Sequence, residues 1–242
     1  MALDQCADQY VLALSPRAAI VSLSERALAR DSYLAGKARG LPRRRATTES
    51  VLAARPDVVV RYWGGDTSLL EDLRRRGVKV ATIADAVDFN GVRANITVVS
   101  HALGEDAAGR ALIAGMNREL AGVAGAWGGR GAFYLTSGDA TTGGGTLIDA
   151  MLRATGLTNL ESGHGYRTVS LERMVLFPPA ALVLGYFDAP SLAGQRWSVG
   201  RHAAVRRLAA ARTLVSLPAA VLGCPAWFAA DGAASIAAAA RR

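Results

Sequence analysis

A phrase that occurs twice constrains most strongly how this chain folds. Residues 48–63 read TESVLAARPDVVVRYW, and residues 170–187 read SLERMVLFPPAALVLGYF. In each copy a glutamate, Glu49 or Glu172, precedes a proline by seven residues, and an apolar run ending in aromatic side chains follows. A polar cap, a short helix, a terminating proline and a buried strand account for each copy. The copies lie about half the chain apart, so the repeat predicts two similar lobes.

The other apolar runs alternate between strand-like and helical patterns. Most strand-like runs are continuous, which is typical of parallel sheets covered on both faces. They occupy residues 18–24, 57–63, 78–84, 131–137, 180–187 and 213–218. Helical patterns occupy residues 48–56, 68–77, 147–156, 171–179 and 202–212. The sequence therefore predicts an α/β fold.

Residues 89–127 break this alternation because they contain no strand pattern. Their apolar residues recur at helical spacing, so we expect a helical connector between the two α/β halves. The predicted boundaries are an N-terminal lobe over 1–101, a linking helix over 102–127 and a C-terminal lobe over 128–242.

Charge and motifs exclude several classes of function. The net charge of +8 comes mostly from arginine clusters such as Arg43, Arg44 and Arg45, and a basic surface suits anionic partners. No nucleic-acid-binding module is recognisable, and no phosphate-binding loop, nucleophile elbow or metal-ligand spacing occurs. We therefore predict no enzyme, no metal site, no cofactor and no nucleic-acid partner. The glycines at 143–145 are expected to form an adaptable loop before a helix.

The ends of the chain leave its cellular location open. No apolar run reaches the roughly 18 residues of a membrane span, and the N-terminus lacks the pattern of a signal peptide. The protein is then either cytoplasmic or a secreted protein whose leader is missing. The two cysteines, Cys6 and Cys224, form one disulfide if the protein is exported, or two semi-buried thiols if it is not.

Candidate ligand contacts lie where strands end. In open parallel sheets the ligand crevice lies beyond the carboxyl ends of the strands. We therefore expect the aromatic pairs that end the repeated phrase to face a crevice, namely Tyr62 with Trp63 and Tyr186 with Phe187. His164 lies in a loop between glycines and is a further candidate, because such loops often carry function.

Four phrases together resemble one family of proteins. These are TESVLAARPDVVVRYWGG, LLEDLRRRGVKVATI, GGGTLIDAMLRATGLTNL and VSLERMVLFPPAALVLG. Their order and spacing are similar to those of the substrate-binding proteins of ABC importers for vitamin B12, iron-siderophore complexes and haem. The resemblance covers nearly the whole chain, including DQCADQYVLAL, where the family has a short strand and turn.

The resemblance implies a fold and a role. The implied fold is two Rossmann-like α/β lobes joined by one long helix, the class III periplasmic binding protein of the helical-backbone metal receptor type, with ligand bound between the lobes. The implied protein is periplasmic and monomeric, and it delivers a metal chelate to an ABC transporter permease. Each lobe of the family presents a glutamate that pairs with permease arginines, and Glu49 and Glu172 fall at the matching positions.

The resemblance also gathers the ligand contacts into one set. Flat aromatic walls suit a corrin, a porphyrin or a catecholate chelate, and arginines suit carboxylates. The expected contacts are Arg61, Tyr62, Trp63, His164, Tyr166, Arg167, Tyr186, Phe187 and Trp227. In this reading Cys6 ends the first strand and Cys224 follows the last, so a bond between them would tether the lobes. The alternatives are a cytoplasmic α/β enzyme or nucleotide-binding protein, and a sensor that uses the bilobal fold without transport.

Overall fold

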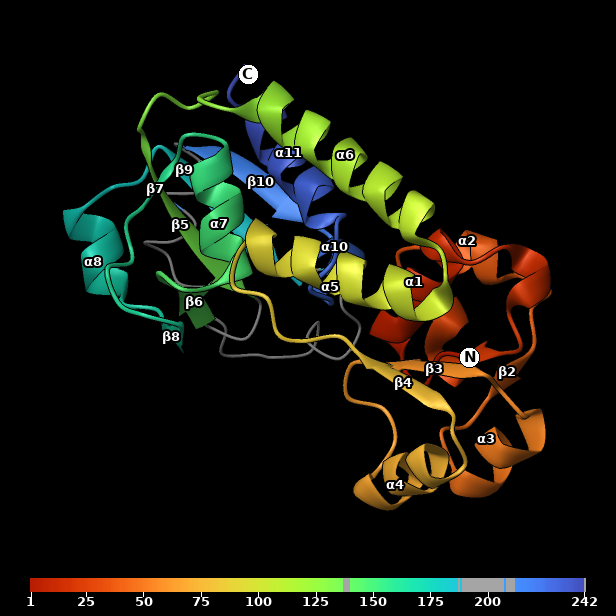
Figure 1. Cartoon of the computed structure of the whole chain (residues 1–242). Coiled ribbons are helices and arrows are strands. Elements are labelled where there is room, and N and C mark those ends of the chain that lie inside the picture. The colour runs from red at the N-terminus through yellow and green to blue at the C-terminus, as the bar shows by residue number, and fades with distance from the viewer. Residues whose placement is uncertain (137–139, 187, 189–206, 208–211, 242) are drawn as a thin grey trace. The chain divides into compact units, whose positions relative to one another are not determined.

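The computed structural model describes residues 1–136, 140–186, 188, 207 and 212–241, which fold into two compact units (Figure 1). Unit 1 comprises Met1–Asp85, Asn90–Ala114 and Cys224–Ala226, and unit 2 comprises Ala86–Phe89, Gly115–Gly223 and Trp227–Arg242. The predicted α/β class with parallel sheets is confirmed. Predicted helix 202–212 and Phe187 lie largely or wholly outside the described residues.

Unit 1 is built on short parallel strands. Its central segment is the chain's first three residues, where Ala2 donates a backbone hydrogen bond to Ser22 and forms an isolated parallel β-bridge with Val60. Parallel pairs β1–β2 and β3–β4 lie on the two sides of this segment. The strands are β1 (Leu23–Ser24), β2 (Arg43–Arg44), β3 (Val58–Arg61) and β4 (Lys79–Thr82).

Helices and 3₁₀ turns connect these strands. They are α1 (Gln5–Leu14), η1 (Arg17–Ala19), η2 (Glu25–Leu28), α2 (Ala35–Ala38), α3 (Thr48–Ala54), α4 (Thr67–Arg75) and α5 (Phe89–Leu103). One cluster of the core of unit 1 consists of Met1, Leu3, Val51, Val59, Leu69 and Leu73, all buried. The strand expected over 18–24 is shorter than predicted, because residues 17–19 form a 3₁₀ turn and only Leu23 and Ser24 pair.

Unit 2 contains a four-stranded parallel sheet in the order β10-β9-β5-β7. Its strands are β5 (Gly131–Thr136), β7 (Thr158–Asn159), β9 (Ala181–Gly185) and β10 (Thr213–Leu217), and β6 (Ala140–Thr142) pairs antiparallel with β8 (Tyr166–Thr168). Among the residues that the structure describes, the helices that follow α6 (Asp106–Val123) are α7 (Leu147–Ala154), α8 (Leu171–Leu176), α10 (Ala219–Leu222) and α11 (Ala229–Ala239). A buried cluster of Phe133, Leu135, Val169, Met174 and Leu182 packs on this sheet.

The two units repeat one topology. In unit 1 the opening segment, α1, β1, α3 and β3 follow in this order, with η1, η2, α2 and β2 between them. In unit 2 β5, α7, β7, α8 and β9 follow in the same order, with β6 and β8 between them. In each unit the strand after the repeated helix lies beside the first segment of the repeat, since Val60 pairs with Ala2 and β9 pairs with β5. The repeated phrase is therefore the visible part of a longer structural repeat.

Two helices occupy the helical stretch predicted over 89–127, and the second, α6, lies within the linking helix predicted over 102–127. Helix α6 (Asp106–Val123) follows α5 after a break at Gly104, which has a φ of +74°. A Cβ at Gly109 would lie 2.2 Å from the hydroxyl oxygen of Ser100, so this glycine permits close packing of the two helices. The chain passes from unit 1 to unit 2 between Ala114 and Gly115, within α6.

The opening segment differs from the expected strand and turn. Residues 5–14 form a ten-residue helix, α1, because Asp4 caps it and apolar residues at 7, 10, 11 and 14 recur at helical spacing. The placement of Cys6 at the end of the first strand was wrong, since Cys6 lies in the first turn of α1.

The two cysteines form a disulfide. The Cys6–Cys224 bond joins α1 to the short segment that follows α10, and both cysteines belong to unit 1. It closes a loop of 218 residues, and the chain-entropy argument gives such a cross-link about 2 to 5 kcal/mol of stabilisation. Tyr10 adds a second link to the same segment, since its hydroxyl donates to the carbonyl of Pro225 at 2.6 Å. That the bond limits movement between lobes stays a prediction.

Candidate functional site

The carboxylate of Asp4 organises the strand ends of unit 1. Asp4 is buried, and its Oδ2 accepts hydrogen bonds from the backbone N–H groups of Tyr62, Trp63 and Gly64 at 2.7, 3.1 and 2.9 Å. Its Oδ1 accepts from the N–H of Ala7 at 2.9 Å and caps α1. One side chain therefore fixes both the start of α1 and the turn that carries the predicted aromatic pair.

Other polar residues of α1 hold the neighbouring loops. Asp8 accepts hydrogen bonds from the backbone N–H and the hydroxyl of Ser24 at 2.8 and 2.6 Å. Gln9 accepts from the N–H of Leu34, and Gln5 accepts from Nε of Arg26 at 2.7 Å. The segments around Ser24, Arg26 and Leu34 are thus anchored to α1. The residues responsible belong to an Asp-Gln pair that occurs at 4–5 and again at 8–9. Sequence reasoning missed these four residues, although the repeated Asp-Gln pair was visible.

The turn after β3 presents its aromatic residues differently. The indole of Trp63 is 60% exposed, whereas the hydroxyl of Tyr62 is hydrogen-bonded to the carboxylate of Asp85. Nε of Arg61 donates to the carbonyl of Gly64 at 2.6 Å and so stabilises the turn. A Cβ at Gly64 would lie 2.6 Å from the carbonyl oxygen of Leu3, which explains the glycine at this close approach. Trp63 is therefore the residue of this turn most open to a ligand.

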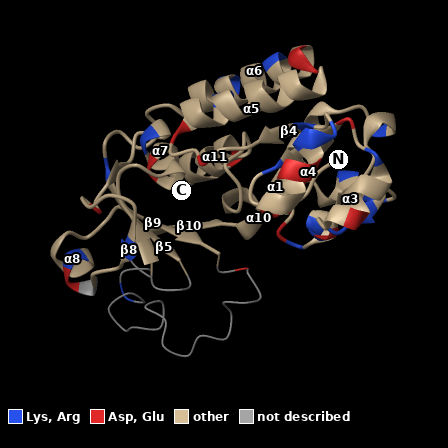
Figure 2. Cartoon of the chain, turned by 60° about the horizontal axis from the view of Figure 1, so that its bottom comes forward, with Lys and Arg blue, Asp and Glu red and all other residues tan. Residues whose placement is uncertain are grey.

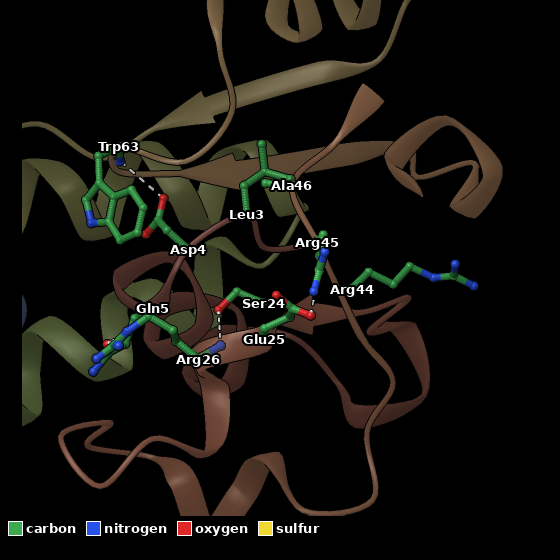
Figure 3. Close-up of a pocket in the computed structure, with 10 residues that line it drawn as sticks. All are labelled: Leu3, Asp4, Gln5, Ser24, Glu25, Arg26, Arg44, Arg45, Ala46 and Trp63. Atoms are coloured by element: carbon green, nitrogen blue, oxygen red, sulfur yellow. Dashed lines mark hydrogen bonds and ion pairs between the residues drawn. The ribbon is translucent and has the colours of Figure 1, made fainter. Parts of the chain in front are cut away.

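A pocket of about 230 Å³ opens beside Trp63 within unit 1, and we call it the Trp63 pocket (Figure 3). Its lining comes from the carboxyl ends of four neighbouring segments. These are Asp4 after the opening segment, Ser24 in β1 with Glu25 after it, Arg44 in β2 with Arg45 after it, and Trp63 after β3. Leu3 and Ala46 contribute apolar surface. This is the edge at which parallel sheets bind ligands.

In unit 2 the glycine run is packed rather than adaptable. Gly143 and Gly144 donate backbone hydrogen bonds to Gly165 and Gly163, each at 3.0 Å. A Cβ at Gly143 would lie 1.9 Å from the carbonyl oxygen of Gly163, and one at Gly145 would lie 2.1 Å from the ring of His164. The expectation of an adaptable loop was wrong, because the run needs glycine to pack against the segment around His164.

The glycine run and the His164 segment border a polar pocket of about 440 Å³ in unit 2. Its buried carboxylates are already engaged. Asp149 pairs with Arg153 at 2.8 Å and accepts from Asn159, while Glu161 accepts from the N–H of Gly163 at 2.9 Å. Nε of Arg167 lies 3.9 Å from the Glu161 carboxylate. Within the described residues no group of three or more His, Cys, Asp or Glu side chains is arranged to hold a metal ion.

The remaining predicted ligand contacts of unit 2 lie in three different environments. Tyr166 lies on β8 and is 63% exposed. Tyr186 directly follows β9, as Tyr62 follows β3, and its hydroxyl donates to the carbonyl of Leu222 at 2.9 Å. Trp227 packs edge to face on Phe228 with ring centroids 5.3 Å apart. Ligand contact by each of these residues stays a prediction.

The repeated glutamates occupy identical helix positions. Glu49 is the second residue of α3 after its cap Thr47, and Glu172 is the second residue of α8 after its cap Ser170. Both side chains are exposed, and neither forms an ion pair with another described residue. A carboxylate in the first turn is stabilised by the helix dipole, which accounts for its local compatibility.

Comparison of the sequence with protein-family models identifies the family of this chain. Residues 2–213 match the family described as periplasmic binding protein. The chain belongs to that family. A comparison with curated proteins found no match.

Solved structures share the fold of this periplasmic binding protein. The periplasmic haem-binding protein RhuT from Roseiflexus sp. RS-1 is 20% identical with a TM-score of 0.71, covering 99% of this chain and 97% of its own. The vitamin B12-binding protein BtuF of Vibrio cholerae is 18% identical with a TM-score of 0.64, covering 99% and 95%. A protein of an Fe³⁺-hydroxamate transport system from Saccharomonospora viridis is 17% identical with a TM-score of 0.66, covering 98% and 91%. The likeness confirms the class III periplasmic binding fold. Among the described residues, no helix has the length and apolarity needed to cross a membrane.

We expect Asp4→Ala to lower the free energy of unfolding by about 3 kcal/mol or more, because four backbone N–H groups lose their buried acceptor. Asp66→Ala is the matched control, since Asp66 caps α4 through one hydrogen bond to Leu69 and should cost about 1 kcal/mol. Urea unfolding of both variants provides the measurement. An Asp4 variant no less stable than the Asp66 variant would contradict the organising role.

Stability should also depend on Asp8. Burial raises the pKa of Asp8 to about 6, although its hydrogen bonds to Ser24 oppose the rise. Between about pH 4 and pH 6 the folded protein therefore binds more protons than the unfolded chain, and this carboxyl lowers the stability as pH rises. Asp8→Asn removes the titration and can keep both bonds to Ser24, so its stability relative to the native protein should increase through that range by about 1 to 3 kcal/mol. Urea unfolding at a series of pH values measures this difference, and a constant difference would refute the assignment.

Proposed function

We propose that this protein is a solute-binding protein that captures a metal chelate and delivers it to the permease of an ABC importer. The Trp63 pocket carries the proposal. In a periplasmic binding protein fold, four strand ends of unit 1 place a largely exposed indole beside arginines and apolar side chains. A flat aromatic face with nearby cations suits a large planar or aromatic chelate that bears charged groups. The names of the similar structures, which bind haem or vitamin B12 or belong to Fe³⁺-hydroxamate transport, support the same ligand class.

In unit 1 the proposed ligand contacts are Trp63 and Tyr62. Unit 2 offers His164, Tyr166 and Tyr186 as candidate contacts of its own. The hydroxyl groups of Tyr62 and Tyr186 are held by Asp85 and by the Leu222 carbonyl, so these rings are positioned before a ligand arrives. Pre-positioned aromatic side chains lose less entropy on binding. The protein itself supplies recognition, and the chelate is cargo rather than a cofactor.

Purified protein should bind one chelate per chain, without turnover. Titration with haem, cobalamin and a ferric siderophore, followed by absorbance and by quenching of tryptophan fluorescence, tests this expectation. Trp63→Ala should weaken binding about tenfold or more, whereas Trp127→Phe provides an aromatic control, because Trp127 is buried in unit 2 with its Nε1 donating to the carbonyl of Ile236. If no chelate binds while a nucleotide does, the proposal fails.

The permease contact is proposed for the two exposed glutamates. Glu49 and Glu172 share one helix position on α3 and α8, so each unit offers a carboxylate at the same place in its repeat (Figure 2). Exposed ion pairs contribute only about 0.2 to 1 kcal/mol each, so their main effects are orientation and encounter rate. Val175 and Leu176 on α8 and Phe177 directly after it are more than half exposed and add apolar surface near Glu172. A charge flanked by apolar residues is suited to a protein interface.

The double variant Glu49→Ala with Glu172→Ala should keep its affinity for the chelate and lose most transport. Uptake of the labelled chelate into vesicles containing the permease measures transport, and titration measures affinity. Glu71→Ala is the control, because Glu71 is an exposed glutamate of α4 outside the repeated phrase. Normal uptake by the double variant would rule out the docking role.

A further inference from the structure

The amino ends of the strands in unit 1 form a surface of their own. The carboxyl ends of these strands meet at the Trp63 pocket, so the amino ends lie at the other edge of the sheet. Because helices connect the parallel strands, the carboxyl ends of those helices also lie at this second edge. Six exposed cations occupy it, and we call them the basic edge: Arg39, Arg43, Arg55, Arg74, Arg76 and Lys79.

Most of the charge on the basic edge is not neutralised within the fold. None of the six cations forms an ion pair with another described residue. Nearby carboxylates offset part of the charge, since Asp57 directly precedes β3 and Asp72 of α4 pairs with Arg75. Cations that lie close together without partners repel one another. The basic edge is therefore suited to an anionic partner from outside the chain.

Helix ends explain only part of the basic edge. The helix dipole stabilises cations at the end of a helix, which accounts for Arg74 and Arg76 at the end of α4 and for Arg55 after α3. Arg43 and Lys79 are instead the first residues of strands β2 and β4. The positive charge therefore follows the edge of the sheet rather than the end of any one helix.

A further arginine fixes the backbone at one end of the basic edge. The two Nη groups of Arg17 donate to the carbonyls of Lys37 and Arg39, at 2.8 and 2.5 Å. These bonds hold the segment that leads into β2 and so position Arg39 and Arg43. The guanidinium of Arg17 is thereby committed to the fold rather than to a partner.

The basic edge has the shape of a row. Neighbouring strands lie about 4.8 Å apart, so β2, β1, the opening segment, β3 and β4 spread the six cations over roughly 19 Å. A single small anion can contact one or two of them, whereas a chain of anionic groups can follow the row. Five of the six are arginines, whose guanidinium groups bind phosphate with two parallel hydrogen bonds. The row and its composition together favour a polymer of phosphates.

We propose that the basic edge binds an extended polymer that carries phosphate groups along its chain, with the guanidinium groups of the row each pairing with a phosphate. Helix α3 runs from Glu49 in its first turn to Arg55 after its last, so the proposed permease contact and the basic edge lie at opposite ends of this helix. Unit 1 can therefore hold the polymer while its other edge stays open to a chelate. This inference goes beyond the proposed function and does not depend on it.

Long-chain polyphosphate is the probe, and inorganic phosphate is its monomeric control. Titration calorimetry with the full chain at low salt measures both affinities. We expect polyphosphate to bind about 100-fold or more tightly per phosphate than inorganic phosphate, because several contacts form at once. The logarithm of the association constant should fall linearly with the logarithm of the salt concentration.

A fourfold variant removes charge along the whole row. Arg43→Gln, Arg55→Gln, Arg74→Gln and Lys79→Gln together should weaken polyphosphate binding about tenfold or more. The slope of the salt dependence should decrease by about three, since each contact with a single-stranded polyanion releases about 0.7 counterion. These side chains are exposed, so the fold and the affinity for the chelate should be unchanged, as circular dichroism and chelate titration can check.

The matched control removes the same charge elsewhere. Arg110 and Arg118 lie on α6, Arg212 directly precedes β10 and Arg241 follows α11, and all four are exposed. Replacing these four arginines by glutamine should weaken polyphosphate binding less than about threefold, because only the general attraction of the net charge is lost. Equal weakening by the two fourfold variants would reduce the effect to net charge and overturn the proposal.

Two other anionic partners supply the remaining outcomes. Vesicles of anionic phospholipid present a flat charged surface, and single-stranded DNA binds tightly where aromatic side chains stack on its bases. The basic edge is a row and contains no aromatic residue, so polyphosphate should bind more tightly per phosphate than either. Tighter binding of vesicles or of DNA would overturn the proposal, and so would a failure of polyphosphate to bind. The chelate titration is independent of these results, so it tests the proposed function separately.

Discussion

The buried carboxylate of Asp4 is the interaction on which the N-terminal unit depends. A carboxylate without partners costs several kcal/mol to bury, and here four backbone N–H groups offset that cost. Because three of those groups belong to consecutive residues after β3, the carboxylate also shapes the turn that presents Trp63. Leu3 packs in the core directly before Asp4, so the central segment, the helix and the binding turn are fixed by adjacent residues. The site is therefore part of the folding unit and does not lie on an independent loop.

Helix α1 also holds the lining of the Trp63 pocket through a second buried carboxylate, that of Asp8. Asp8 is fully buried with a raised pKa, and it holds Ser24, whose neighbour Glu25 pairs with Arg45 at the pocket. A polar network of this kind costs stability if any member is unpaired, but it fixes each loop in one position when every member is satisfied. The Cys6–Cys224 disulfide then anchors the first turn of α1. Together these contacts give the backbone around the pocket a fixed frame.

The repeated phrase predicted much of the architecture because its signals are local. Caps at Thr47 and Ser170, the prolines after α3 and α8 and the continuous apolar strands each depend on residues close in sequence, and the structure shows the expected elements. The opening helix was missed, because the resemblance suggested a strand and turn and the Asp-Gln pattern was not taken as a cap. One feature depends on distant residues and could not be read from spacing, namely the packing of the glycine run against His164.

The sequence by itself determined the α/β class, the twofold repeat, and Glu49 and Glu172 as equivalent positions, because periodicity, caps and prolines act within a few residues. Only the tertiary structure decided which side chains gather at the strand ends. Asp4, Glu25, Arg45 and Trp63 come from four segments, and no local pattern relates them. Parallel strands bring their carboxyl ends to one edge of a sheet, so the pocket exists only once the strands pair.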